Sequence, residues 1–138
     1  MRQNLKIYCD GGARGNPGPA AAAFIVEKNS RVIYKGAKFL GKTTNNVAEY
    51  NATIIATRWI LENLKEFSGQ ITFYLDSELV AKQLSGKFRV KNENLRNLFF
   101  TIKTLEKQIS AKVNYLSVPR EKNKIADFLV NKILDENS

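Results

Sequence analysis

Three strand-like segments follow one another at the start of this chain, and helices and strands alternate after them. Three apolar, β-prone stretches separated by polar turns predict an antiparallel meander, at residues 5–9, 20–27 and 31–40. Apolar periodicity and length then predict four helices, at 46–65, 77–84, 92–108 and 122–134, and two further strands, at 71–75 and 112–118. This order indicates an α/β fold in which helices pack over a mixed sheet.

Two of these strands carry more specific expectations. We expect the first strand to stop at Asp10, because residues 10–19 are rich in glycine, proline and asparagine, which favour turns. The strand at 71–75 is a nearly continuous apolar run, and such a run predicts burial on both faces of the sheet.

The length and composition suit a single domain spanning residues 1–138. The chain is 43% hydrophobic and 25% charged, an ordinary globular balance. No apolar run approaches the ~20 residues of a bilayer span, and the N-terminus lacks the apolar core of a signal peptide, so no membrane contact is expected. The single cysteine, Cys9, fits a reducing compartment. We therefore expect a cytoplasmic monomer.

Net charge points to a polyanionic partner. The chain carries 22 basic and 13 acidic side chains, a net charge of +9. The excess is concentrated between residues 79 and 124, where 11 basic side chains face three acidic ones. A basic segment of this kind favours nucleic acid as the partner, although a solvated surface tuned for solubility would have the same composition.

The absence of histidine excludes His-based triads, His-ligated zinc and haem, so attention falls on the acids. Asp10 and Asp76 end predicted strands, where open α/β sheets place ligand sites, although both positions also suit a turn or a helix N-cap. Glu49 follows Asn46 by three residues, which is the spacing of a capping box. Asp127 lies inside a predicted helix, where it has no capping task.

These four acids predict a metal site if the fold brings them together. Clustered carboxylates without a cation repel one another strongly in a low-dielectric site. Oxygen ligands without His or Cys favour Mg²⁺ or Mn²⁺ over zinc.

One segment also satisfies the phosphate-binding pattern of nucleotide-binding proteins. Residues 36–43, GAKFLGKT, match G-x-x-x-x-G-K-[ST], follow a predicted strand and precede a predicted helix. Against this alternative, Phe39 and Leu40 look like a continuing strand, whereas a phosphate cradle needs a flexible loop of backbone donors.

Four longer stretches contain the acids in order, namely 7–18 (IYCDGGARGNPG), 43–49 (TTNNVAE), 74–77 (YLDS) and 119–127 (PREKNKIAD). Together they resemble the motifs of type 1 ribonuclease H, in the order of that family. The resemblance implies a five-stranded mixed sheet, with three antiparallel strands followed by two parallel ones, flanked by helices. It also implies endonucleolytic hydrolysis of the RNA strand of RNA–DNA hybrids, with water as the nucleophile.

The same resemblance implies a role for each acid. Asp10 would bridge two Mg²⁺ ions, Glu49 and Asp76 would complete one site, and Asp127 would help to hold the other ion beside the attacking water. Two ions can activate water and stabilise both the attacking and the leaving oxygen of a phosphate displacement. No side-chain nucleophile is then needed, and Mn²⁺ is an alternative cofactor.

Substrate contacts are implied in the same way. Family likeness assigns hybrid binding to six residues, namely Gly11, Gly12, Asn16, Thr44, Asn45 and Asn46. Amide side chains can both donate to and accept from the 2′-hydroxyl that distinguishes RNA from DNA. Double-stranded RNA stays open as a second substrate.

Three departures from the family pattern are visible. The histidine that many relatives carry before the last helix is absent, and Arg120 or Glu121 is the candidate substitute in product release. Glu78 stands where some relatives place a glutamine that touches RNA. The basic handle of some members is reduced to residues 86–91. A catalytically inactive hybrid-binding module with the same fold is the second alternative, although the presence of all four acids argues against it.

Overall fold

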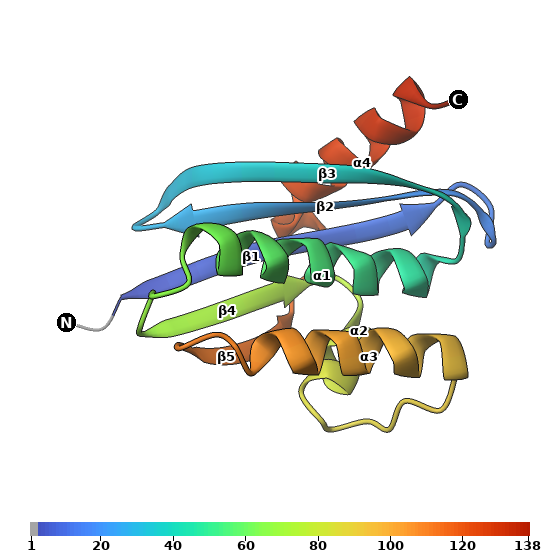
Figure 1. Ribbon diagram of the computed structural model, residues 1–138. Coiled ribbons are helices and arrows are strands. Elements are labelled where there is room, and N and C mark those ends of the chain that lie inside the picture. Colours follow the sequence, from blue (N-terminus) through green and yellow to red (C-terminus); the bar gives the residue numbers. More distant parts are fainter. Residues whose placement is uncertain (1–2) are drawn as a thin grey trace.

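The computed structural model describes residues 3–138 as one five-stranded sheet flanked by helices (Figure 1). The strands are β1 (Asn4–Ala13), β2 (Gly18–Lys28), β3 (Arg31–Thr43), β4 (Gln70–Leu75) and β5 (Lys112–Ser117). The helices are α1 (Asn45–Asn63), α2 (Glu78–Leu84), α3 (Glu93–Glu106), the 3₁₀ turn η1 (Arg120–Lys122) and α4 (Lys124–Glu136). The strand order is β3-β2-β1-β4-β5; β1–β2 and β2–β3 are antiparallel, whereas β1–β4 and β4–β5 are parallel. The mixed sheet implied by the resemblance is confirmed.

Helices cover the two faces of the sheet unequally. In Figure 1, α1 and α3 lie in front of the sheet and α4 lies behind it. The main core forms under α1 and α3, where the buried side chains of β1, β2 and β4 meet those of the helices. A smaller cluster joins α4 to β2 through Ala21, Ala23, Val130 and Leu134. Small alanines on β2 allow α4 to approach the sheet closely.

The first strand is longer than the sequence indicated. β1 runs through Asp10, Gly11 and Gly12 to Ala13, and pairs there with residues 20–23 of β2. The expectation that it stops at Asp10 is therefore wrong. The local turn preference of glycine is overridden here, because the alanine-rich strand β2 pairs with these residues along their whole length.

The nucleotide-binding alternative is also wrong. Residues 36–43 lie within β3 and pair with residues 18–24 of β2, so their backbone groups are not free to cradle a phosphate. The glycine at position 36 is explained by packing instead, because a Cβ there would lie 2.4 Å from the ring of Phe24.

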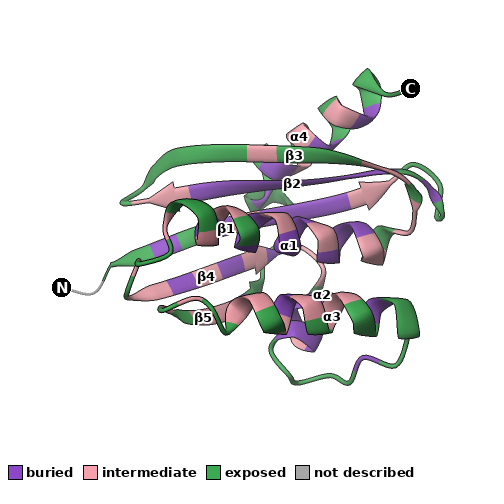
Figure 2. Ribbon diagram, viewed as in Figure 1, coloured by how far each residue is buried: buried purple, intermediate pink, exposed green. Residues whose placement is uncertain are grey.

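Burial of β4 alternates along the strand. Ile71, Phe73 and Leu75 are fully buried, whereas Thr72 and Tyr74 are partly exposed, so the expectation of burial on both faces is wrong. α4 packs over β1 and β2, and at β4 the second face carries a stack of Tyr74 on Tyr8. Figure 2 shows a further contrast, between the largely buried central strands β1 and β2 and the largely exposed edge strand β3.

The capping roles that the sequence suggested for Glu49 and Asp76 are not observed. The N-cap of α1 is Thr44, whose hydroxyl accepts from the N–H of Val47, so Asn46 and Glu49 form no capping box. The N-cap of α2 is Ser77 rather than Asp76. Both carboxylates are thus free of capping tasks.

Among residues 3–138, none of the helices combines the length and the apolar character that a bilayer span requires.

Candidate active site

A cleft of about 490 Å³ lies at the end of the sheet where β1 and β4 finish. These two strands are parallel neighbours, so their carboxyl ends meet at one edge, which is where open α/β sheets bind ligands. The cleft is lined by Asp10, Gly11, Gly12, Ala13, Arg14, Asn45, Asn46, Glu49, Asp76, Ser77, Arg120, Asp127, Val130, Asn131 and Leu134. Segments from all parts of the chain therefore converge here.

Three of the four predicted acids form a tight cluster within the cleft. Oxygen atoms of Asp10, Glu49 and Asp76 all lie within 4.8 Å of one another. The parallel pairing of β1 with β4 ends at Cys9 and Leu75, so the residues that follow in the chain, Asp10 within β1 and Asp76 just after β4, lie side by side. Glu49 reaches them from the first half of α1, and its Oε1 accepts a hydrogen bond of 3.2 Å from the N–H of Gly11.

Burial makes this cluster electrostatically costly. Asp10 is 6% exposed and Glu49 is 4% exposed. Burial, followed by repulsion from Asp76, raises the pKa of Asp10 to about 7. Burial, followed by the charges of Asp76 and Asp10, also raises the pKa of Glu49 well above its usual range. Within the described part of the chain, the one ion pair to these acids is the contact between Arg120 Nε and Asp76 Oδ2, at 3.9 Å.

The donor set fits a divalent cation. Glu49 Oε2 and Asp76 Oδ2 are buried without a hydrogen-bond partner among the described residues, which is a costly state for carboxylate oxygens. A cation would supply the missing charge and the missing partners at once. Because every ligand atom in the cluster is a carboxylate oxygen, the site suits a hard ion.

Asp127 lies in the first turn of α4 and lines the same cleft, but it is not part of the tight cluster. Its carboxylate Oδ1 accepts a hydrogen bond of 3.4 Å from the side chain of Asn131. The structure thus places the fourth predicted acid on the cleft wall, separate from the other three.

The six predicted substrate residues divide into two groups. Gly11, Gly12, Asn45 and Asn46 line the cleft, whereas Asn16 and Thr44 do not. Asn16 Oδ1 accepts from the N–H of Asn45 at 3.0 Å, and Asn45 Oδ1 accepts from the N–H of Ala13 at 2.8 Å. These two bonds tie the turn after β1 to the start of α1. Thr44 caps that helix.

The two candidate substitutes for the missing histidine, Arg120 and Glu121, lie in different places. Arg120 lines the cleft, whereas Glu121 lines a different cavity of about 190 Å³, together with Tyr8 and Ile25. Glu78 pairs with Lys82 at 2.6 Å on α2.

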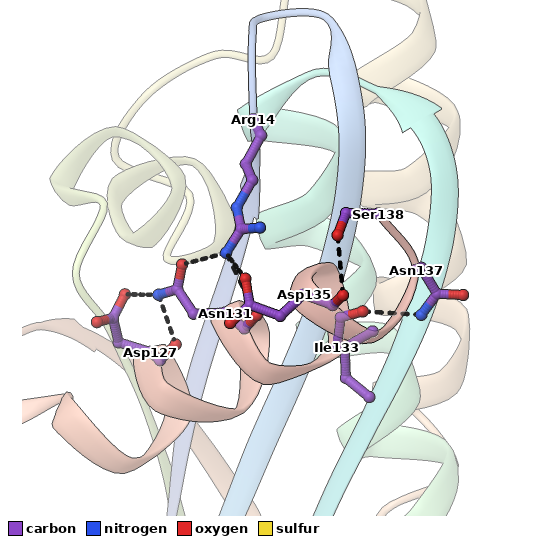
Figure 3. A network of polar contacts seen from close by, with 7 residues as sticks. All are labelled: Arg14, Asp127, Asn131, Ile133, Asp135, Asn137 and Ser138. Carbon is purple, nitrogen blue, oxygen red and sulfur yellow. Dashed lines mark hydrogen bonds and ion pairs between the residues drawn. The ribbon is translucent and has the colours of Figure 1, made fainter.

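Two cleft residues, Arg14 and Asn131, are absent from the expectations drawn from sequence. Figure 3 shows Arg14 reaching from the turn after β1 to Asn131, which contacts Asp127. A signal for Asn131 exists in the chain, because Asp127, Asn131 and Asp135 recur every fourth residue and so share one helix face, but no comparable pattern marks Arg14.

Comparison with known proteins places this geometry in a family. Residues 8–133 match the family model described as reverse transcriptase-like. Ribonuclease HI of Halobacterium salinarum is 37% identical over 134 residues, covering 96% of this chain and 65% of that protein. A bifunctional protein of Mycobacterium tuberculosis is 37% identical over 131 residues, covering 94% of this chain and 35% of that protein. The chain therefore spans less than two thirds of the length of these relatives.

Solved structures agree with the sequence matches. The crystal structure of LC11-RNase H1 in complex with an RNA/DNA hybrid has a TM-score of 0.92 and 34% sequence identity, and the match covers 96% of this chain and 98% of that one. The fold is thus shared with that structure, and the acid cluster of this chain lies in the cleft at the edge of its sheet. It therefore belongs to the reverse transcriptase-like family and, within it, to the type 1 ribonucleases H.

Proposed function

We propose that this chain hydrolyses the RNA strand of RNA–DNA hybrids endonucleolytically, with water as the nucleophile and two divalent ions as cofactors. The observation that carries the proposal is the cluster of Asp10, Glu49 and Asp76, in which two carboxylate oxygens are buried without a hydrogen-bond partner among the described residues. The likeness to a type 1 enzyme whose structure contains an RNA/DNA hybrid supports the choice of substrate.

Each acid has a distinct part in this proposal. Asp10, Glu49 and Asp76 would hold the ions within the cluster, and Asp127 would help to hold the second ion from the cleft wall. Mg²⁺, or alternatively Mn²⁺, would supply Lewis-acid activation of water and neutralise charge at the scissile phosphate. Asp10 and Glu49 must lose their protons before they can bind a cation. The bound cation then offsets the free-energy penalty of burying their negative charges.

The neighbouring polar groups position the duplex. Asn45 and Asn46 face the cleft beside the backbone of Gly11 and Gly12, so we assign these four residues to the RNA strand. Asn16 holds the backbone of Asn45, and Thr44 seats a DNA phosphate at the start of α1. Arg120 lies 3.9 Å from Asp76, so we assign product release to Arg120 rather than to Glu121, which faces another cavity.

The remaining features of the proposal concern the whole chain. We propose that residues 1–138 act as one catalytic domain and as a monomer. The buried, unpaired thiol of Cys9 is compatible with work in the reducing cytoplasm. Double-stranded RNA is a further candidate substrate.

A single duplex sequence tests the proposal. It is prepared as RNA–DNA hybrid, double-stranded RNA and double-stranded DNA, labelled on either strand, and incubated with Mg²⁺ or Mn²⁺. We expect cuts within the RNA strand of the hybrid, no cuts in DNA, and complete inhibition by a chelator. Scission that persists in the chelator would overturn the metal assignment.

The inactive binding module makes a different prediction for the same duplexes. It would retain the hybrid in a binding assay and leave every strand intact at both metal ions. Comparison of wild type with Asp10→Asn, in parallel cleavage and binding assays, separates the two possibilities.

A further inference from the structure

A chain of polar contacts runs from the turn after β1 to the carboxylate of Asp127 (Figure 3). Arg14 Nη2 lies 2.7 Å from Asp135 Oδ1 and donates to both Oδ1 and the main-chain O of Asn131, each at 3.3 Å. Asn131 Nδ2 in turn donates to the main-chain O of Asp127 at 3.0 Å and to its Oδ1 at 3.4 Å. One guanidinium therefore contacts two residues on one face of α4.

The chemistry of these groups sets the direction of each contact. A guanidinium carries only donors, so the oxygen of the Asn131 amide must face Arg14. The amide nitrogen is then turned toward Asp127, where it can only donate. If Arg14 were absent, the amide could rotate and present its oxygen to the carboxylate, which would repel it. Arg14 therefore fixes which end of Asn131 meets Asp127.

Asp127 depends on this contact more than the other acids do. Asp10 and Glu49 are held by burial and by neighbouring backbone, whereas Asp127 is partly exposed on the cleft wall. Among residues 3–138, Asn131 is the one side chain that hydrogen-bonds its carboxylate. Figure 3 shows the second carboxylate oxygen of Asp127 pointing away from Asn131. Holding one oxygen thus fixes the direction of the other.

The same turn also contacts the opposite wall of the cleft. Asn16 lies two residues after Arg14, and its side chain holds the backbone of Asn45 at the start of α1. Arg14 and Asn16 therefore connect one short turn to both helices that border the cleft, α1 and α4.

We propose that Arg14 is a positioning residue that acts through Asn131 to orient the Asp127 carboxylate toward the cleft. The inference rests on the proposed function for its catalytic consequence, but not for its geometry. The ion pair with Asp135 is largely exposed on both sides, so it anchors Arg14 while contributing little to stability.

Kinetics of hybrid cleavage give the first test. Arg14→Leu and Asn131→Ala are each expected to lower kcat about tenfold with KM changed less than about twofold, the range typical of removing a group that orients a metal ligand. The double variant should be no slower than Asn131→Ala, because both act along one path. Arg14→Lys keeps a cationic donor without the planar fork and should recover part of the loss.

Asn137→Ala is the matched control for Asn131→Ala. Both asparagines lie at the C-terminal part of the chain, and each donates to the main-chain oxygen four residues earlier, that of Ile133 for Asn137. Only Asn131 also touches a cleft acid. Equal losses in the two alanine variants, additive losses in the Arg14/Asn131 pair, or an effect confined to KM would each overturn the proposal.

A spectroscopic test uses the metal-free protein and needs no activity. The side-chain amide resonances of Asn131 in ¹H–¹⁵N spectra should shift in Arg14→Leu and stay in place in Asn137→Ala. Unmoved resonances in Arg14→Leu would overturn the proposal. If the wild-type chain fails to cleave the hybrid, the proposed function fails, and these spectra still decide whether Arg14 orients Asn131.

Discussion

The main-chain N–H of Gly11 donates a hydrogen bond to Glu49 Oε1 at 3.2 Å, at a point where the backbones of β1 and α1 approach each other closely. A Cβ on Gly11 would lie 2.2 Å from the main-chain carbon and oxygen of Ala48. The missing side chain therefore does two things: it lets the helix approach the strand, and it brings Glu49 within reach of Asp10.

Substitution of Gly11 by alanine should destabilise the protein and disturb the site together. The new methyl group meets backbone atoms that cannot rotate away, so we expect a loss of about 3 kcal/mol or more in the free energy of unfolding, at the upper end of overpacking effects. Denaturant unfolding of the metal-free protein measures this loss. Calorimetric titration with Mn²⁺ should show weaker binding in the same variant.

Gly12→Ala is the neighbouring control in the same strand. A Cβ at Gly12 would have no atom nearer than 3.9 Å, so its free energy of unfolding should change by less than about 1 kcal/mol. Similar losses in the two variants would show that glycine matters here for strand conformation rather than for the approach of α1.

The local sequence pattern predicts most of the helices and strands, because each of these elements has its own periodicity of apolar residues. The α1 helix, expected at 46–65, is observed at Asn45–Asn63, and β5, expected at 112–118, is observed at Lys112–Ser117. The pattern failed where tertiary pairing decides. Whether Gly11 and Gly12 extend a strand depends on residues 20–23, and one-sided burial of β4 depends on where α4 packs.

The candidate site was predictable as residue types but not as distances. Motif order pointed to four acids, yet no spacing in the chain says that Asp10, Glu49 and Asp76 approach within 4.8 Å while Asp127 stays outside the group. Arg14 and Asn131 were missed because they are 117 residues apart, and they meet only through the packing of α4 on the sheet. Local periodicity carries no information about a pairing of that kind.

Stability of the metal-free protein should fall as the pH rises. The pKa of Asp10 is raised from its ordinary value of 3.8 to about 7, chiefly by burial and next by Asp76. Between these two pH values the folded protein binds more protons than the unfolded chain. The stabilisation that protonated Asp10 gives the folded protein is therefore fully present below about pH 4, and it is lost as the pH rises through about 7. We expect the free energy of unfolding in a chelator to be a few kcal/mol lower at about pH 8 than at about pH 5.

Asp10→Asn is the control for that pH dependence, since the amide does not titrate in this range. The slope of unfolding free energy against pH should become shallower in this variant, with the remainder due to Glu49, whose pKa is also raised. An unchanged slope would show that Asp10 is not the group responsible.

The same substitution should separate activity from stability. Asn has the size of the native Asp10 side chain but carries no charge, whereas the native carboxylate is only 6% exposed in the folded protein. Hybrid cleavage should fall at least about 1,000-fold, as for other essential catalytic carboxylates, while the metal-free variant at about pH 8 unfolds at higher denaturant than wild type. Loss of activity accompanied by lower stability would instead point to a structural role for the acid.

Binding of the hybrid should depend on salt through the loop at residues 86–91. Lys87, Arg89 and Lys91 are all exposed there, between α2 and α3. Replacing the three with alanine should weaken hybrid binding and reduce the slope of log K against log salt by up to about 3, roughly one for each phosphate that is no longer neutralised. Fluorescence anisotropy of a labelled hybrid in Ca²⁺, at several salt concentrations, measures both quantities.

A matched triple variant tests whether location or total charge matters. Lys6, Arg31 and Lys65 are also exposed, but they lie near the start of β1, at the start of β3 and just after the end of α1, which is the end of the sheet remote from the cleft. Both triple variants lower the net charge by the same amount. If the 86–91 loop contacts the backbone of the duplex, only its variant should lose salt slope, whereas equal losses would mean that the overall charge attracts the hybrid without a defined contact.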